Sequence, residues 1–358
     1  ADAPVVTVLV PTLNAKSTIK LCLAGIMSQD LRDLEIICID GGSVDGTLKA
    51  IREFARRDYR IRLLYSDKVS YAHQINLGLD EARGTYVAVV EAQDYLEDDA
   101  LSTLVGLARA FKADVVQANY FRREPDGEHF AEALRGLPYG VPFAPAEHPE
   151  LLCALDGIGS GLYSRALIEG VGIRAREDAG QSYAYLSFML KVWMSAERVL
   201  AVKKPFYHCR MDAQRGISDP SLHRFAVCDE FADVEAFMHE KALVNHEFER
   251  GLAARRAIEY RRNHHRLTEE YREEFVERIR PELLAARQRG LFDESLASEE
   301  DMAFVTDVLE DPEKLFRRVS GSRGKLLKDR FKDTGLGEVM VKPYLKVKRF
   351  IKRVRAGE

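Results

Sequence analysis

The amino-acid sequence predicts an α/β fold, in which a mainly parallel sheet carries helices on both faces, followed by an all-α C-terminal region. Two observations predict this. Up to residue 118, short apolar runs rich in β-branched residues alternate with segments of helical periodicity. From about residue 221 the chain is charged, lacks such runs and repeats its apolar residues at helical spacing. We therefore expect two domains, residues 1–220 and 221–358.

The first domain is built from alternating strand and helix patterns. The predicted strands are the apolar runs at residues 5–10, 34–39, 61–65, 86–90 and 114–118. The predicted helices between them cover residues 17–29, 48–57, 71–82 and 98–111. Ser17 is expected to cap the first helix, and Gly84 to close the third in a C′ position.

The rest of this domain is less regular. Residues 122–150 are rich in Pro, Gly and charge and indicate an excursion over the surface. A turn and a short strand are expected near 157–165, and an apolar helix at 181–196. Two further strands, 199–202 and 206–209, are separated by Lys-Lys-Pro. Trp193, the single tryptophan, lies in the apolar helix and is expected in the core.

Composition excludes several classes of protein. Hydrophobic residues make up 46% of the chain and charged residues 31%, which is ordinary for a globular protein. The five cysteines include no CxxC pair, which argues against a disulfide scaffold or a zinc site. No apolar run is long enough to span a membrane, and no signal peptide is evident at the start, so a cytoplasmic protein is expected. Walker A, GxGxxG and G-x-S-x-G patterns do not occur.

Polar residues follow three of the predicted strands at the point where each strand ends. These segments are residues 11–14 (PTLN), 40–43 (DGGS) and 91–94 (EAQD). Ligands of open α/β sheets bind beyond the carboxyl ends of the strands, so the three segments are expected to converge on one crevice. Acidic oxygens there can hold a hard divalent cation. The alternative is that these residues only form turns and helix caps.

Five ordered motifs carry a family resemblance: PTLN, EIICIDGGSVDGT, SYAHQINLGLDEARGTY, VVEAQDYL and YHCRMDAQRGIS. Together they resemble the family 2 glycosyltransferases of GT-A fold, in the bacterial branch that assembles surface polysaccharides. The resemblance covers roughly residues 4–220. It implies an inverting transfer of a sugar from a nucleotide-diphosphate donor, expected to be a UDP-sugar, to a surface glycan or a lipid-linked acceptor.

The resemblance also assigns roles to individual residues. The residues implied to bind the nucleotide sugar are Pro11, Thr12, Asn14, Asp40, Gly42, Ser43, His73, Gln74, Asn76, Glu91, Ala92 and Arg210. The residues implied to hold Mg²⁺ or Mn²⁺ are Gln93, Asp94 and His208. Gln93 stands where the family has a carboxylate, so we expect weak or substrate-assisted metal binding. Gly41 stands where the family has a second Asp, so the role of reading the nucleotide base falls on Asp40 alone.

The catalytic base has two alternative assignments. An inverting transferase needs a carboxylate to remove the acceptor's proton. In one alignment, Asp178 of the segment Arg176-Glu-Asp is that base. In the other alignment, Ala184 and Tyr185 occupy the place of the family's Gln-Asp pair, and the base is missing. The first predicts an active transferase, and the second a degenerate domain that binds a nucleotide sugar or a partner protein without transfer.

The C-terminal tail differs in charge from the rest of the chain. Residues 314–358 contain 15 Lys and Arg against 4 Asp and Glu, whereas the rest carries a net charge of −15. The acidic body argues against a nucleic-acid partner. Residues 342–358 alternate basic and apolar side chains at roughly helical spacing. They are expected to lie peripherally on an anionic membrane surface, the alternative being to pack against the acidic body.

Overall fold

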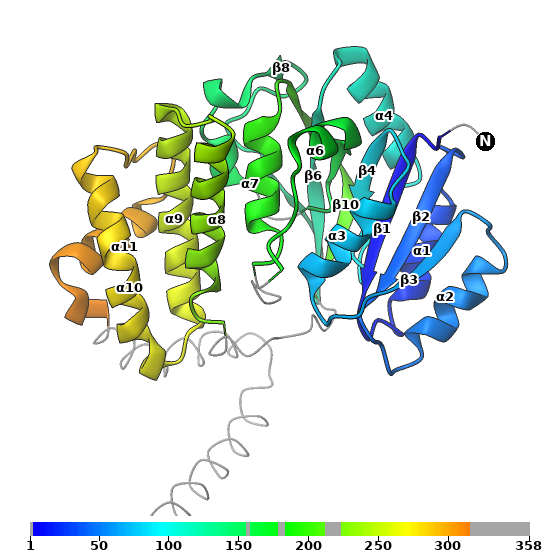
Figure 1. The fold of residues 1–358 in the computed structure, drawn as a ribbon, viewed down its shortest axis with the longest axis horizontal. Helices are drawn as coiled ribbons and strands as arrows, with labels where there is room; N and C mark the ends of the chain where they lie inside the picture. Colours follow the sequence, from blue (N-terminus) through cyan, green and yellow to red (C-terminus); the bar gives the residue numbers. More distant parts are fainter. Residues whose placement is uncertain (1–2, 155–157, 178–182, 212–222, 316–358) are drawn as a thin grey trace, which may run out of the picture.

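The computed structural model describes residues 3–154, 158–177, 183–211 and 223–315 (Figure 1). The predicted base Asp178 and the tail 342–358 lie outside the described residues. The strands are β1 Val6–Thr12, β2 Leu34–Asp40, β3 Ile61–Tyr65, β4 Tyr86–Val89, β5 Tyr95–Leu96, β6 Val115–Glu124, β7 Gly127–Ala131, β8 Pro142–Phe143, β9 Gly161–Ser164 and β10 Val199–Arg210.

The helices that cover the sheet are α1 Ile19–Met27, α2 Thr47–Ala55, α3 Tyr71–Glu81, α4 Ala100–Phe111, α5 Leu151–Ala154, α6 Arg165–Val171 and α7 Leu186–Ser195. A 3-10 turn occupies Pro145–Glu147. The C-terminal helices are α8 Ala226–Glu240, α9 His246–Arg266, α10 Glu269–Gln288 and α11 Glu299–Glu310. In Figure 1 these four helices stand on the side of α7, away from the edge strand β3 and its neighbour β2. The predicted α/β domain followed by an all-α region is therefore confirmed.

The described strands form one sheet in the order β3-β2-β1-β4-β9-β6-β10-β5, with β7 paired to β6 and β8 paired to β10. The strands β3, β2, β1 and β4 are parallel, as predicted, and β6 runs parallel to β10. The pairs that include β5, β7, β8 or β9 are antiparallel. The sheet is thus mixed, with a parallel half that contains the three polar strand ends.

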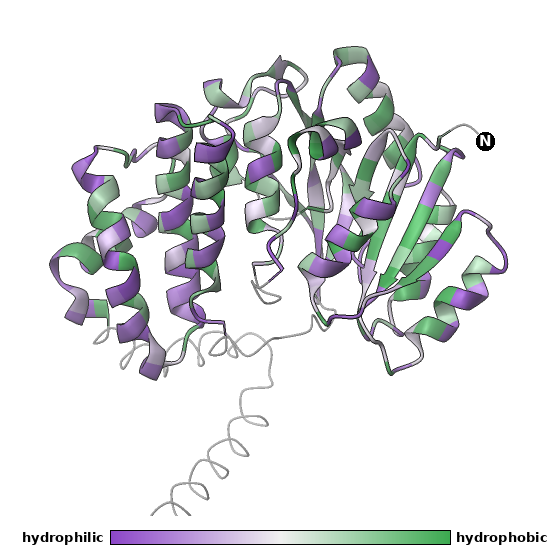
Figure 2. Cartoon of the chain, viewed as in Figure 1, coloured by the Kyte–Doolittle hydropathy of each residue, from purple (hydrophilic) through white to green (hydrophobic). Residues whose placement is uncertain are grey.

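Strands β1 and β2 are buried along their whole lengths, because helices cover both faces of the sheet. One core cluster includes Leu9 and Ile37, and a second includes Val8 and Ile36, so successive residues of each strand enter opposite layers. In Figure 2 the central strands of the sheet are largely green, which marks them as apolar. The parallel register pairs Thr12 with Asp40, which brings the last residues of β1 and β2 together at one edge.

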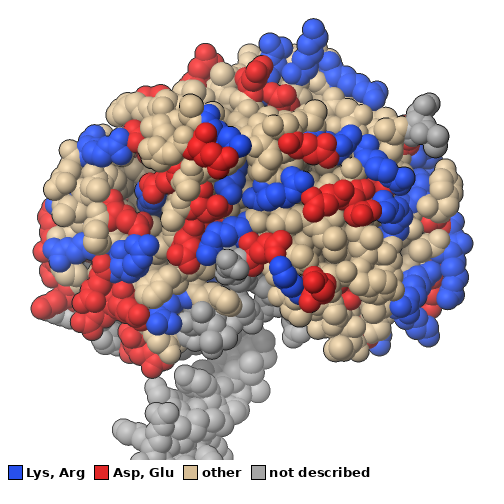
Figure 3. Space-filling model, in the orientation of Figure 1, with Lys and Arg blue, Asp and Glu red and all other residues tan. Residues whose placement is uncertain are grey.

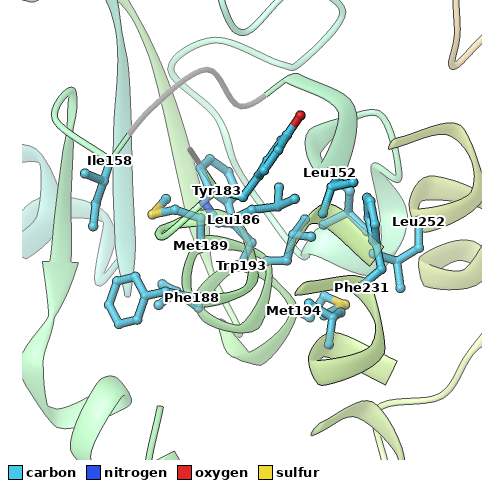
Figure 4. Close-up of a cluster of buried hydrophobic side chains, with 14 of the residues drawn as sticks. Leu152, Ile158, Tyr183, Leu186, Phe188, Met189, Trp193, Met194, Phe231 and Leu252 are labelled. Atoms are coloured by element: carbon cyan, nitrogen blue, oxygen red, sulfur yellow. The ribbon is translucent and has the colours of Figure 1, made fainter. Parts of the chain in front are cut away.

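Helix α7 joins the sheet domain to the helical region through apolar side chains. Trp193 is fully buried, as predicted, and belongs to the same cluster as Phe231 of α8 and Leu252 of α9. Figure 4 shows these side chains around α7, together with Tyr183, whose phenolic oxygen points away from the cluster. Full burial of a large side chain contributes about 1.5–3 kcal/mol, so this continuous core favours folding of the two regions as one unit.

Several local predictions are wrong for identifiable reasons. Gly84 does not cap α3 in a left-handed conformation. A Cβ there would lie 2.4 Å from the backbone nitrogen of Thr7, so the glycine permits close approach to β1. The first helix is capped at Thr18, not Ser17. The two strands predicted between 199 and 209 form the single strand β10, whose register shifts between Val202 and Tyr207.

The predicted excursion at 122–150 contains regular structure, since the end of β6 and strands β7 and β8 lie within it. Helix α6 was not predicted, because its seven residues give too short a periodic pattern. The five cysteines are free, as expected. In the described ranges, no helix is long and apolar enough to cross a membrane. Acidic and basic side chains are interspersed over the face in Figure 3.

Glu230 of α8 provides a pH-dependent contact between α7 and α8. It is fully buried and accepts a hydrogen bond from the backbone N–H of Ser187 at 2.9 Å. Burial raises the pKa of Glu230 to about 7. Because the folded-state pKa lies above the unfolded-state value, the ionised carboxylate destabilises the protein, and this effect grows as the pH rises from about 4.5 through 7.

We expect Glu230→Gln to raise the free energy of unfolding at pH 8 by roughly 2–3 kcal/mol, since the amide oxygen can still accept from Ser187. At pH 4 the gain should disappear, because the wild-type carboxyl is then neutral. Urea denaturation at both pH values measures this, with the neighbouring Asp229→Asn as control. A glutamine variant less stable than wild type at pH 8 contradicts the prediction.

Candidate active site

The ends of β1 and β2 are joined by a reciprocal set of hydrogen bonds. The backbone N–H of Asn14 donates to Ser43 Oγ at 2.9 Å, and Asn14 Oδ1 accepts from the backbone of Val44 at 2.9 Å. Asn14 has φ of 50°, a left-handed conformation that asparagine tolerates. Asp40 Oδ2 accepts from the backbone N–H groups of Gly42 and Ser43, both at 2.9 Å. Hydrogen bonds therefore join the two predicted segments, residues 11–14 and 40–43, to each other.

Asp40 is 1% exposed, and its buried carboxyl group is satisfied by the turn that it caps. The other oxygen, Oδ1, lies 3.4 Å from the hydroxyl of Thr12. Pro11 and Thr12 are both buried in β1. At this strand end, Asn14 is exposed and accessible to a ligand.

Gln74 connects helix α3 to the same strand ends. Its Nε2 donates to the backbone carbonyls of Thr12 at 2.8 Å and Ile39 at 2.7 Å. A Cβ on Gly41 would lie 3.0 Å from this nitrogen, so the missing side chain at Gly41 leaves the space that Gln74 occupies. Gln74 therefore orients the two strand ends through their backbone.

The first turn of α3 connects the strand ends to a distant segment of the chain. The Tyr71 hydroxyl donates to Oε1 of Glu91, the first residue of the EAQD segment, at 3.4 Å. His73 Nδ1 lies 2.9 Å from Glu177 Oε1, and its Nε2 lies 2.8 Å from Asp67 Oδ1. One helical turn thus contacts both the predicted metal segment and the segment that precedes the predicted base.

The segment before Asp178 is fixed against α3. Asn76 accepts from the backbone N–H of Ala175 at 2.8 Å and donates to its carbonyl at 2.9 Å. Lys68 Nζ lies 2.7 Å from Glu177 Oε2. The hydrogen bonds from Lys68 and His73 lower the pKa of Glu177 to about 2, so this carboxylate stays ionised at neutral pH. Asp178 follows directly in sequence.

The EAQD segment after β4 has internal partners. The Gln93 amide nitrogen donates to Glu91 Oε2. Asp94 is 1% exposed, and its Oδ2 accepts from the Tyr207 hydroxyl at 2.7 Å. Its Oδ1 accepts from the backbone N–H of Arg210 at 2.8 Å. The EAQD segment therefore meets the YHCR strand, and the buried Asp94 lies between the two. Ala92 is also buried.

His208 lies on the same strand but faces other partners. Its ring stacks on Tyr95, with centroids 4.3 Å apart, and on Phe121 at 4.9 Å. Its Nδ1 lies 2.7 Å from Glu128 Oε2, and its Nε2 lies 2.7 Å from Glu97 Oε1. His208 would have to leave one of these carboxylates to ligate a cation.

The oxygen donors at the strand end suit a hard cation only in part. Glu91 and Gln93 are half-buried and offer one carboxylate and one amide, the donor types that Mg²⁺ or Mn²⁺ accept. Asp94 and His208 use their ligand atoms for protein contacts. Among the described residues, Glu124, Asp126 and His129 of the β6–β7 hairpin bring ligand atoms within 4.8 Å of one another, and none of the three belongs to the predicted set. Exposed groups of this kind are common without an ion.

Sequence reasoning missed two tyrosines of the site. Tyr71 and Tyr207 contact Glu91 and Asp94 through their hydroxyl groups. Burial raises the pKa of both phenols well above 10, and the neighbouring carboxylates raise it further, so both remain neutral donors. Tyr207 stands beside His208 in the YHCR motif, which was a usable signal. Tyr71 was not distinguishable from other helical tyrosines before its contact with Glu91 was known.

The mainly parallel sheet with helices on both faces is the architecture of the GT-A fold, and comparison with known families agrees. Residues 7–158 match the profile described as Glycosyl transferase family 2. This N-terminal part of the chain is therefore similar to glycosyl transferase family 2.

Curated relatives are glycosyltransferases of bacteria. The chain is 27% identical over 217 residues to glycosyltransferase GlyA of Streptococcus pneumoniae, a match that covers 58% of this chain and 30% of that protein. It is 27% identical over 209 residues to the uncharacterized glycosyltransferase EpsJ of Bacillus subtilis, covering 57% of this chain and 60% of the relative. The matched region thus spans from under a third to three fifths of the length of these relatives.

Solved structures share the fold. S. aureus TarS residues 1–349, in complex with UDP, align with a TM-score of 0.65 and 17% identity, covering 89% of this chain and 91% of that one. The mannosyltransferase PcManGT from Pyrobaculum calidifontis, in complex with GDP-Man and Mn²⁺, aligns with a TM-score of 0.51 and 19% identity, covering 86% of both. The alignment with TarS covers both the sheet domain and most of the helical region, so the architecture as a whole is shared.

Proposed function

We propose that the protein is an inverting glycosyltransferase that takes a sugar from a UDP-sugar and passes it to a bacterial surface glycan or a lipid-linked acceptor. The observation that carries the proposal is the first turn of α3. Its Tyr71, His73 and Gln74 contact Glu91, Glu177 and the ends of β1 and β2, respectively. One rigid element thereby connects the donor-binding, metal and base segments that a transferase needs.

The donor would lie across the ends of β1, β2 and β4. Asn14 and Ser43 are at the accessible rim, and the buried Asp40 holds the backbone of the turn in place. Glu91 and Gln93 would hold a divalent cation, which neutralises the leaving diphosphate when bound. Arg210, whose backbone N–H donates to Asp94, would supply a guanidinium for the diphosphate.

The base would come from the segment fixed by α3. Asp178 follows Glu177, whose carboxylate is bound by Lys68, His73 and Asn76. Since Glu177 is occupied by these partners, Asp178 is the carboxylate of the pair assigned to remove the acceptor proton. Tyr185, the residue at the alternative position, precedes α7 and is a neutral phenol at pH 7.

A second candidate function is nucleotide-sugar or partner binding without transfer. The specific observation that favours it is that two predicted metal ligands already make contacts with other protein groups. Asp94 is buried against Tyr207 and Arg210, and His208 is held between Glu97 and Glu128. A site in which these residues have purely structural roles would keep the fold and the donor crevice but lose the cation.

Calorimetric titration of UDP, GDP and TDP sugars, with and without Mn²⁺, tests the proposal. We expect UDP-sugars to bind most tightly and Mn²⁺ to strengthen binding. Release of UDP on a mixed panel of glycan and lipid-linked acceptors then separates the two candidates. Binding without turnover on any acceptor supports the second candidate, and no binding of any nucleotide rejects both.

The cation site should gain strength from an added carboxylate. Gln93→Asp is expected to tighten Mn²⁺ binding in the presence of UDP by about tenfold, because a second negative charge beside Glu91 attracts the ion. Calorimetry with Mn²⁺ at fixed UDP measures the change, and Gln93→Ala is the control for loss of the amide. If the wild type already binds Mn²⁺ tightly and Gln93→Asp gains nothing, the charge argument is wrong.

A further inference from the structure

The hydroxyl group of Tyr207, on β10, contacts both ends of the EAQD segment, residues 91–94. Its oxygen accepts from the backbone N–H of Glu91 at 3.3 Å, and its proton is donated to Asp94 Oδ2 at 2.7 Å. The backbone N–H of Asp94 donates to the carbonyl of Glu91 at 2.8 Å, so these two residues also close a turn. One phenol therefore joins the first and last residues of the EAQD turn to β10.

The direction of each hydrogen bond follows from the groups involved. A backbone N–H can only donate, so Glu91 uses a lone pair of the phenolic oxygen and leaves the hydroxyl proton for Asp94. Tyr207 is 5% exposed and Asp94 is 1% exposed. Because bulk water cannot readily replace a partner at such depth, loss of the hydroxyl would remove two contacts that fix the turn.

A glycine makes room for this phenol. A Cβ on Gly159 would lie 2.4 Å from Cζ of Tyr207 and 2.6 Å from its hydroxyl oxygen, so a residue with a side chain could not stand there without displacing the ring. Gly159 lies in the turn expected near residues 157–165, to which the sequence assigned no function. The backbone of this turn therefore lies directly against the end of the phenol ring.

The turn around Gly159 is itself held at both neighbouring residues. The Ile158 carbonyl accepts from the Tyr163 hydroxyl at 2.8 Å, and the Ser160 carbonyl accepts from the backbone N–H of Ala118 at 2.9 Å. Tyr163 belongs to β9 and Ala118 to β6, so these contacts tie the turn to the sheet. A side chain added at Gly159 would therefore displace the phenol ring and not the turn.

The EAQD turn carries the side chains proposed to hold the cation. Glu91 and Gln93 are half-buried and contact each other, and Tyr71 donates to Glu91 Oε1 at 3.4 Å. Both side chains can face a common ligand only while the backbone of residues 91–94 keeps its conformation. Tyr71 holds the end of the Glu91 side chain, whereas Tyr207 holds the Glu91 backbone.

We propose that Tyr207 is a positioning residue of the donor site: its hydroxyl, backed by Gly159, holds the EAQD turn in the conformation that lets Glu91 and Gln93 bind one cation together. The inference deepens the proposed transferase function and rests on it. Residues that orient metal ligands without touching the metal typically change metal affinity by about 10- to 100-fold when they are mutated. Loss of the hydroxyl should therefore weaken the cation site more than the nucleotide site.

Two matched pairs of variants test this in the full chain. Tyr207→Phe removes the hydroxyl and keeps the ring, and Tyr260→Phe is its control, since it removes a buried hydroxyl that contacts Glu282 in the helical region. Gly159→Ala displaces the ring with the hydroxyl retained. Gly170→Ala on α6 is its control, because no other described group lies within 4 Å of a Cβ there. Calorimetry measures UDP affinity with and without saturating Mn²⁺, and thermal unfolding shows which variants are folded.

We expect Mn²⁺ to raise the UDP affinity of the wild type and of both controls, and this gain to fall about tenfold or more in Tyr207→Phe and Gly159→Ala. UDP affinity without Mn²⁺ should stay within about twofold, because the contacts of Asn14 and Ser43 do not change. A hydroxyl with a purely structural role would lower the stability of Tyr207→Phe but leave the gain from Mn²⁺ unchanged.

Amide hydrogen exchange of the wild type, followed by NMR, is a measurement that needs no variant. The Glu91 amide should exchange slowly, since its N–H donates to Tyr207. Rapid exchange of this amide, or a full Mn²⁺ gain in folded Tyr207→Phe, overturns the inference, and so does a wild type that binds UDP with no gain from Mn²⁺. In each of these cases UDP binding still supports the proposed donor site. A wild type that binds no UDP rejects the proposed function, and the inference with it.

Discussion

Asp178→Asn is expected to lower the rate of sugar transfer by about 10²- to 10⁴-fold, the usual contribution of a general base, with UDP affinity nearly unchanged. The physical reason is that the neighbouring carboxylate, Glu177, is already bound by other side chains. Glu177 is bound by Lys68, His73 and Asn76, and its pKa is lowered to about 2, so it is a poor proton acceptor at neutral pH. Asp178 is then the carboxylate of this pair that can take the proton.

The rate of UDP release, with donor and acceptor saturating, measures this change. Tyr185→Phe is the matched control, because it changes the residue that the alternative alignment puts in the same role and keeps its ring. We expect that variant to retain transfer. An Asp178→Asn protein that turns over at the wild-type rate would remove Asp178 from the mechanism.

Asp40→Ala should weaken UDP binding by about 1–3 kcal/mol, the cost of losing a charged hydrogen-bond partner. Its carboxylate accepts two backbone N–H groups, from Gly42 and Ser43, which leaves these groups without a side-chain acceptor in the variant. The turn that presents Ser43 to Asn14 should then loosen, so the nucleotide loses both the charge and the shape of its binding surface.

Calorimetric titration with UDP measures the loss, and thermal unfolding checks that the variant is folded. Asp98→Ala changes an exposed Asp that contacts Ser28 instead of the strand ends and should bind UDP normally. Asp40→Asn separates charge from shape, since the amide oxygen can still accept from the turn. Unchanged UDP affinity in a folded Asp40→Ala protein rejects the assignment of Asp40 to the donor site.

The parallel half of the sheet could be predicted because each of its strands can be recognised from its own short stretch of sequence. The runs at β1 and β2 are apolar along their length and end at Pro11-Thr12 and at Asp40, which fixes both the strands and the edge where their ends meet. The antiparallel strands could not be predicted in the same way. Strand β5 has two residues and pairs with β10 more than 100 positions away, so no local pattern distinguishes it from a loop.

The sequence predicted which residues belong to the candidate site better than it predicted the contacts that these residues make. The resemblance identified Asp94 and His208 but not their contacts. The sequence could not reveal that Asp94 accepts hydrogen bonds from Tyr207 and Arg210. It also could not reveal that the ring nitrogens of His208 contact Glu97 and Glu128. These partners lie in β7, in β10 and directly after β5, and the arrangement of these strands depends on long-range pairing.

The measurement that tests the central claim most directly is a crystal structure of the chain soaked with UDP and Mn²⁺. The account predicts that the nucleotide lies at the ends of β1, β2 and β4, with its uracil or ribose next to Asp40 and Asn14 and its diphosphate facing Glu91 and Gln93. UDP bound elsewhere, for example among the arginines of α9 with the strand ends unoccupied, would contradict the claim that the strand-end crevice is the donor site.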